Sequence, residues 1–333
     1  MSDFDPLNAY SSGYVGCRKD PRADEVFADY VLRYGGDPNG ANVAYDWGLE
    51  QAGAGKLSTL WLTLEAVFPG CLPGPAQLYG DCVSHGAAHC LGASIAAEIY
   101  SNKPDEVTGK LEGTPEMPVE GVKNFPIAPE SLFAWRGYNG DGWVCSEAAQ
   151  TACQKGFLIR KPYPNLKIDL TSYNSQTIKL GGATPPGEAW LQESKQHVAR
   201  TATFVKGRDQ TRDFLASGFA VFNCSSLGFE RTRNEDGVSR QVGSWGHSQC
   251  FLGYDDRPET HKKYGQALVL WCNSWGKWQS SGGRKVLGTD LLIPEGCYWA
   301  LADTIDRCQC IALSSVAGWP RRKHTTYGAL GNV

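Results

Sequence analysis

The stretch that decides the fold is CVSHGAAHCLGASIAAEIY, residues 82–100. Its residues are small or apolar on every face, and only two glycines interrupt it as helix breakers. This composition predicts a helix that is enclosed on all sides, where neighbouring backbone packs closely. Because the loop before it is rich in proline and glycine, we expect the helix to begin abruptly at Cys82.

The rest of the chain divides into a helical part and a strand-rich part. A second helix is expected at 145–156, ended by Gly156, and two shorter helices at 22–33 and 57–67. The second half contains short β-rich runs separated by turn residues, at 219–224, 247–254, 267–274 and 297–301. Because the expected helices precede the expected strands in the chain, we predict an α+β fold with two lobes. A cleft between two lobes is a usual place for a substrate to bind.

Composition and charge exclude several classes of protein. The chain has 333 residues and a net charge of −3, with both signs scattered, so we expect neither nucleic acid nor a membrane surface as a partner. No apolar stretch approaches the length that crosses a bilayer. The first twenty residues lack a secretory signal pattern, which favours a cytoplasmic location.

Twelve cysteines are unusual for such a protein. None forms a CxxC pair, so the strongest zinc and thioredoxin signatures are missing, and we expect most of the thiols to be reduced and buried. Cys82 differs from the others because it opens a helix, where unpaired backbone N–H groups lower the pKa of a thiol. The residue therefore fits either a nucleophile or an ordinary buried cysteine.

Three motifs then resemble one family. The segment QLYGDCVSH (77–85) resembles the active-site turn of papain-like cysteine proteases, and its GDC is similar to the calpain branch. Downstream, HSQCFLGY (247–254) resembles the histidine strand of this family, and WCNSWG (271–276) resembles its Asn-Ser-Trp-Gly box. The motifs occur in the family's order, and the similarity covers roughly residues 70–305.

The resemblance implies a Cys-His-Asn triad. Cys82 would be the nucleophile, and His247 would take its proton and later protonate the leaving amine. Asn273 would hold the imidazole ring, and Trp275 would exclude water from that hydrogen bond. Gln77 would form the oxyanion hole together with the backbone N–H of Cys82.

The resemblance also implies where substrate binds next to the triad and how the chain is divided into domains. Gly140 and Gly142 would lie where the family binds extended substrate backbone, near Trp275. The substrate would be a peptide or protein, and neither a metal nor a cofactor would take part. The expected organisation is an N-terminal extension (1–76), a papain-like domain (77–310) with a helical lobe (about 77–165) and an antiparallel β lobe (about 200–310), and a C-terminal tail (311–333).

Some residues depart from the family pattern and keep alternatives open. Gln77 precedes Cys82 by five residues where the family normally has six, and Tyr79 replaces a cysteine of secreted members. A different register would place His85 at the nucleophile position and imply a dead enzyme. The main alternative is thus an inactive papain-fold protein that serves as a structural or binding subunit. Residues 1–76 would then dock it into a larger assembly, such as a virus particle.

A second alternative concerns metal binding. His85 and His89 lie four residues apart and would share one helical face with Cys82, while Cys90 follows directly. Such a cluster could bind zinc, but no clear fourth ligand pair accompanies it. The cysteine-protease interpretation is therefore preferred.

Overall fold

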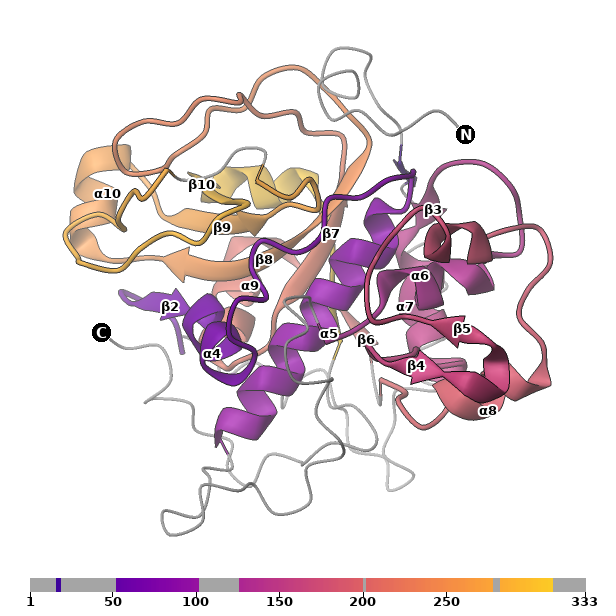
Figure 1. Ribbon diagram of the computed structural model, residues 1–333. Coiled ribbons are helices and arrows are strands. Elements are labelled where there is room, and N and C mark those ends of the chain that lie inside the picture. The colour runs from indigo at the N-terminus through magenta and orange to yellow at the C-terminus, as the bar shows by residue number, and fades with distance from the viewer. Residues whose placement is uncertain (1–15, 19–51, 102–125, 200–201, 278–281, 314–333) are drawn as a thin grey trace, which may run out of the picture.

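The computed structural model describes residues 16–18, 52–101, 126–199, 202–277 and 282–313. The predicted helix at 22–33 lies outside these ranges. Figure 1 shows the arrangement of the described part, in which the long helix α5 runs between a large antiparallel sheet and a group of shorter helices. The predicted two-lobed α+β architecture is confirmed.

Helix α5 spans Cys82–Ser101, as the small-residue stretch predicts. Residues 82–99 are all buried, so no face of the helix meets solvent along that length. Its glycines and alanines allow this enclosure, because small side chains let the sheet approach the helix backbone. An added Cβ on Gly86 would stand 2.6 Å from the Ser248 hydroxyl oxygen of strand β8 (His247–Asp255). The helix therefore joins the two lobes.

The helical lobe packs on one side of α5. Helix α7 (Cys145–Gln154) begins where the sequence predicts and ends two residues earlier than predicted; Gly156 follows it in the left-handed conformation, with φ of 75°. A buried ion pair between Arg160 and Glu130, 2.5 Å apart, links the segment after α7 to α6. The elements of this lobe are α6 (Pro129–Phe133), β3 (Trp143–Val144), α7 (Cys145–Gln154), β4 (Pro162–Tyr163), β5 (Ile168–Asp169) and α8 (Glu188–Ser194), with 3₁₀ turns at Ala134–Arg136, Pro164–Leu166 and Thr177–Leu180.

The β lobe is a seven-stranded antiparallel sheet in the order β10-β9-β8-β7-β11-β6, with β2 also paired to β8. Its strands are β2 (Leu57–Thr59), β6 (Ala202–Val205), β7 (Val221–Ser225), β8 (His247–Asp255), β9 (Leu268–Cys272), β10 (Cys297–Leu301) and β11 (Gln309–Leu313). Helices α9 (Gly207–Ala216) and α10 (Pro258–Tyr264) and a 3₁₀ turn at Ala302–Arg307 complete the lobe. The four predicted strands correspond to β7 to β10, whereas β6, β11 and both helices lack a sequence-based prediction.

Two boundaries in the chain differ from the sequence-based division. The predicted helix at 57–67 is divided into strand β2 and helix α4 (Leu60–Val67), and α4 packs against α5. Trp61 and Leu64 of α4 belong to the main hydrophobic core, so this part of the expected extension is integral to the fold. The expected start of the C-terminal tail at residue 311 falls inside β11, which pairs with β6 and β7.

Gly253→Ala is expected to lower the free energy of unfolding by about 1–3 kcal/mol, because the site has no room for a methyl group. The added Cβ would stand 2.5 Å from the Trp61 ring and 2.9 Å from the Ser58 carbonyl oxygen. Urea denaturation measures the difference. Gly187→Ala is the matched control, since nothing lies within 4 Å of its added Cβ. Equal stability of the two variants would contradict the integral packing of β2 and α4 on β8.

Candidate active site

The N-terminus of α5 holds Cys82 at the junction of the two lobes. Cys82 is the first helical residue, and its side chain is fully buried. The turn before it is anchored to the helical lobe, since Gly80 N–H donates to Asp141 Oδ1 at 3.0 Å and the Gly80 carbonyl accepts from Gly142 N–H at 2.8 Å. A thiol at this position lies at the positive end of the helix dipole, which favours the thiolate.

His247 and Asn273 meet where β8 begins and β9 ends. His247 Nε2 lies 2.9 Å from Asn273 Oδ1, and both side chains are buried. Asn273 Oδ1 also accepts the Ser274 backbone N–H at 2.7 Å, which fixes the orientation of the amide. Because this oxygen can only accept, Nε2 carries the proton and Nδ1 is the acceptor atom of the neutral ring.

Trp275 covers this hydrogen bond. Its ring stacks on the His247 ring with centroids 4.4 Å apart and an interplanar angle of 25°. Trp245 in turn contacts Trp275 edge-on at 5.4 Å. All three rings are buried. Exclusion of water strengthens the bond between His247 and Asn273, because the local dielectric constant is low.

Burial keeps the imidazole neutral. Loss of hydration lowers the pKa of His247 to about 4; the hydrogen bond that His247 donates to Asn273 acts in the opposite direction, and the charge of His85 lowers the pKa further. His85 lies on α5 three residues beyond Cys82 and is itself buried, 3.4 Å from Asp81. In this enclosed state His247 is thus a neutral acceptor rather than an imidazolium.

Gln77 connects the helical lobe to the same part of the β lobe. Its backbone N–H donates to the Ser274 carbonyl at 2.8 Å, and its Oε1 accepts from the Ser274 hydroxyl at 2.5 Å. The Nε2 group donates to the Tyr79 carbonyl at 2.8 Å. Gln77 therefore lies next to Ser274, the residue that follows Asn273, while the nitrogen of the Gln77 side-chain amide points to its own loop at Tyr79.

The two glycines predicted to bind substrate differ in their surroundings. Both have positive φ, 97° at Gly140 and 82° at Gly142. Nothing lies within 4 Å of the position of a Cβ on Gly140, which leaves open space there. The Gly142 carbonyl accepts from Arg136 at 2.8 Å and from the Tyr138 hydroxyl at 2.6 Å, and its N–H bonds to Gly80 as described above. The backbone groups of Gly142 are therefore used within the protein.

A short N-terminal strand lies beside His247, and nothing in the sequence pattern signals it. Strand β1 (Cys17–Arg18) pairs in parallel with β3. The N–H groups of Gly16 and Cys17 donate to the Gly246 carbonyl at 2.6 and 3.1 Å, and Trp143 N–H donates to the Gly16 carbonyl at 3.1 Å. Residues 16–18 therefore bridge the helical lobe and the residue that precedes His247.

The alternative zinc cluster does not assemble in the described part of the chain. His89 Nδ1 lies 3.5 Å from Cys272 Sγ, and His85 contacts Asp81. Cys90 Sγ lies 3.1 Å from the Ala220 carbonyl oxygen. Among the described residues, the group with metal-ligand spacing consists instead of Cys17, Cys145 and Cys224.

Solved structures of other proteins are similar to this chain over most of its length. The chain is similar to cysteine proteases of known structure. Xylellain, a cysteine protease from Xylella fastidiosa, is 12% identical with a TM-score of 0.48, covering 78% of this chain and 86% of xylellain. Procathepsin B S9 from Trypanosoma congolense is 10% identical with a TM-score of 0.46, covering 92% and 88%. The ragweed pollen cysteine protease Amb a 11, in its proform, is 12% identical with a TM-score of 0.45, covering 92% and 76%.

No protein-family model matches the chain, and no curated protein matches it. At 10–13% identity and these TM-scores, the roles of single residues rest on the geometry of the site alone. Among the described helices, none is long and apolar enough to cross a membrane.

Proposed function

We propose that the protein is a papain-like cysteine peptidase with a triad of Cys82, His247 and Asn273. The observation that carries the proposal is the fixed, water-shielded hydrogen bond from His247 Nε2 to Asn273 under Trp275. Because Nε2 carries the proton in this bond, the ring's other nitrogen, Nδ1, is the atom that can accept a thiol proton. Helix α5, which begins at Cys82, packs directly on β8, which begins at His247.

The reaction would be acyl transfer to sulfur. His247 Nδ1 takes the proton of the Cys82 thiol, and the thiolate attacks the carbonyl carbon of a peptide bond. The oxyanion is held by the Cys82 backbone N–H and by Gln77 Nε2, which exchanges its present bond to Tyr79 for the oxyanion. His247 then protonates the leaving amine, and water hydrolyses the thioester. None of these steps requires a metal or cofactor.

Substrate entry has to change the environment of the ring. Because loss of hydration is the main cause of the low pKa of His247, hydration of an opened cleft would raise that pKa. The thiolate–imidazolium pair becomes more favourable at the same time. Movement of residues 16–18 away from Gly246 is the opening that fits this requirement, since these residues lie directly beside His247.

A second candidate is an inactive papain-fold subunit that binds a partner through the N-terminal region, as in a virus particle or another assembly. The position of residues 16–18 beside His247 favours it, and so does the internal use of the Gly142 backbone groups. The two candidates make opposite predictions for the reactivity of Cys82.

Covalent labelling separates the two candidates. We expect an epoxide or fluoromethyl-ketone thiol reagent to modify the parent chain once, and Cys82→Ala to remain unmodified. Cys153→Ala is the control, because Cys153 is half-buried and the mechanism does not use it. Mass spectrometry counts the labels. Equal labelling of Cys82→Ala and the parent would overturn the peptidase proposal, and an unlabelled parent would favour the inactive subunit.

Asn273→Ala is expected to reduce kcat/KM for peptide hydrolysis by about 10–100-fold. The lost hydrogen bond is made to a ring that becomes charged during the reaction, and such bonds contribute about 1.5–3 kcal/mol. Steady-state kinetics on a fluorogenic peptide mixture measures the effect. Asn234→Ala, on an exposed turn away from the site, is the control. An unchanged rate for Asn273→Ala would show that the bond to His247 has no role in the reaction.

A further inference from the structure

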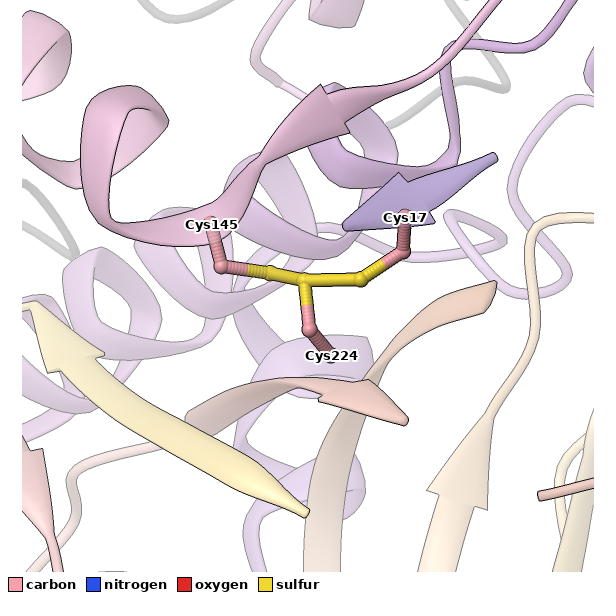
Figure 2. Close-up of side chains that lie close together, drawn as sticks. All are labelled: Cys17, Cys145 and Cys224. Atoms are coloured by element: carbon pink, nitrogen blue, oxygen red, sulfur yellow. A yellow bond between two sulfur atoms is a disulfide. The ribbon is translucent and has the colours of Figure 1, made fainter. Parts of the chain in front are cut away.

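Three cysteines from distant parts of the sequence meet beside the candidate site. Their sulfur atoms all lie within 4.8 Å of one another, and all three side chains are buried. Figure 2 shows how they converge: Cys17 comes from strand β1, Cys145 from the start of helix α7, and Cys224 from strand β7. The other nine cysteines lie outside this cluster.

Cys224 stands within disulfide distance of both partners. The Cα atoms are 5.9 Å apart for Cys17 and Cys224 and 6.2 Å apart for Cys145 and Cys224. Both values suit a disulfide. A sulfur atom forms only one disulfide bond at a time, so the two pairs are alternatives. In either state the third cysteine is a thiol in contact with a disulfide.

We propose that these cysteines form a thiol–disulfide exchange site in which Cys224 alternates between Cys17 and Cys145. The Cys17 thiolate attacks Cys224 Sγ, the Cys17–Cys224 bond forms, and the Cys145–Cys224 bond breaks. Cys145 leaves as a thiolate and takes up the proton that Cys17 gave up, so the exchange needs neither oxidant nor reductant. The first disulfide is formed by a small-molecule disulfide, which is reduced to two thiols.

The surroundings of Cys145 suit a leaving and attacking thiolate. Cys145 is the first residue of α7, a ten-residue helix, so its sulfur lies at the positive end of the helix dipole. The Cys145 thiol donates to the Ser248 hydroxyl oxygen at 3.7 Å, and once Cys145 is a thiolate the same hydroxyl can donate to its sulfur. Cys17 is 6% exposed and the other two are fully buried, so small thiols reach the cluster through Cys17.

The two states differ in what they connect. The Cys17–Cys224 bond attaches strand β1 covalently to β7, whose Ser225 pairs with His247. The Cys145–Cys224 bond cross-links the two lobes instead and leaves β1 held by its hydrogen bonds to Gly246 and Trp143. The exchange therefore decides whether the N-terminal strand is anchored covalently beside His247 or by hydrogen bonds alone.

Disulfide mapping tests the proposal without any measurement of activity. The full-length chain is equilibrated in mixtures of oxidised and reduced glutathione, quenched with acid, alkylated, and digested without reduction for mass spectrometry. We expect two cross-linked species in the parent, Cys17–Cys224 and Cys145–Cys224, with the remaining thiol of the three alkylated. Cys17→Ser should retain only the second species and Cys145→Ser only the first, while the control Cys153→Ser retains both.

If a variant fails to fold, the disulfide map of the parent chain alone still tests the exchange site. One species at every glutathione ratio, or three thiols that stay reduced under oxidising conditions, would overturn the exchange site. Stoichiometric zinc that survives dialysis and blocks all three thiols would also overturn it and would identify a metal site. Zinc usually takes four ligands in structural sites, and the described residues supply three here.

Discussion

Replacing His247 with alanine is expected to lower kcat/KM for peptide hydrolysis by about 10³-fold or more, which is the largest effect anticipated on activity. The ring has two tasks that no neighbour can take over. Its Nδ1 accepts the thiol proton and then returns a proton to the leaving amine. His85, the nearest histidine on α5, is held 3.4 Å from Asp81 and cannot bond to Asn273 in the same way.

The control for this experiment is His261→Ala. His261 lies on helix α10, where its exposed side chain bonds to Asp256 at 2.8 Å, and the proposed mechanism does not use it. Its replacement should leave kcat/KM unchanged. Circular dichroism and thermal unfolding confirm that each variant is folded. A folded His247→Ala variant with activity near that of the parent would rule out His247 as the general base.

Acidification from pH 7 to pH 5 is expected to destabilise the fold by about 4 kcal/mol through His247 and His89. Burial lowers the pKa of His247 to about 4, and burial with the charge of His85 lowers that of His89 to about 3. In the unfolded chain both titrate near 6.5, so the unfolded state binds more protons over this interval. Stability is therefore full above pH 6.5 and falls as the pH drops, by roughly 2 kcal/mol for each histidine.

Urea unfolding at pH 7, 6 and 5 measures this slope. His89→Gln removes one of the two titrating rings, so its slope should be about half that of the parent. A stability that stays constant or increases toward pH 5 would show that the two imidazoles are not held neutral in the folded protein.

The central helix was predictable because its signal is local. A run of small and apolar residues from 82 to 100 has few other stable placements, and the observed helix extends only one residue further. The short apolar runs that form β7 to β10 were predictable for the same reason, because each strand is recognisable from its own residues. Helix α9 was missed because its sequence, GRDQTRDFLA, is mostly polar and presents only a narrow apolar face to the sheet.

The pairing of His247 with Asn273 could be anticipated from motif resemblance, whereas the cysteine cluster could not. Cys17 and Cys224 are separated by 207 residues and Cys145 and Cys224 by 79, with no spacing pattern that connects them. The short strand β1 contributes two residues and has no periodicity to detect. Contacts of this kind arise from the packing of the two lobes, which a local pattern does not encode.

The most direct test of the account is to trap the acyl group on the nucleophile. The chain is mixed with an activated ester of an N-acylated amino acid, quenched in acid within the first turnover, and analysed by intact-mass and peptide mass spectrometry. We predict one added acyl group per chain, located on Cys82 and removed by hydroxylamine, as expected for a thioester. Turnover of the ester with no acyl group on Cys82, or with the group on another residue, would contradict the mechanism.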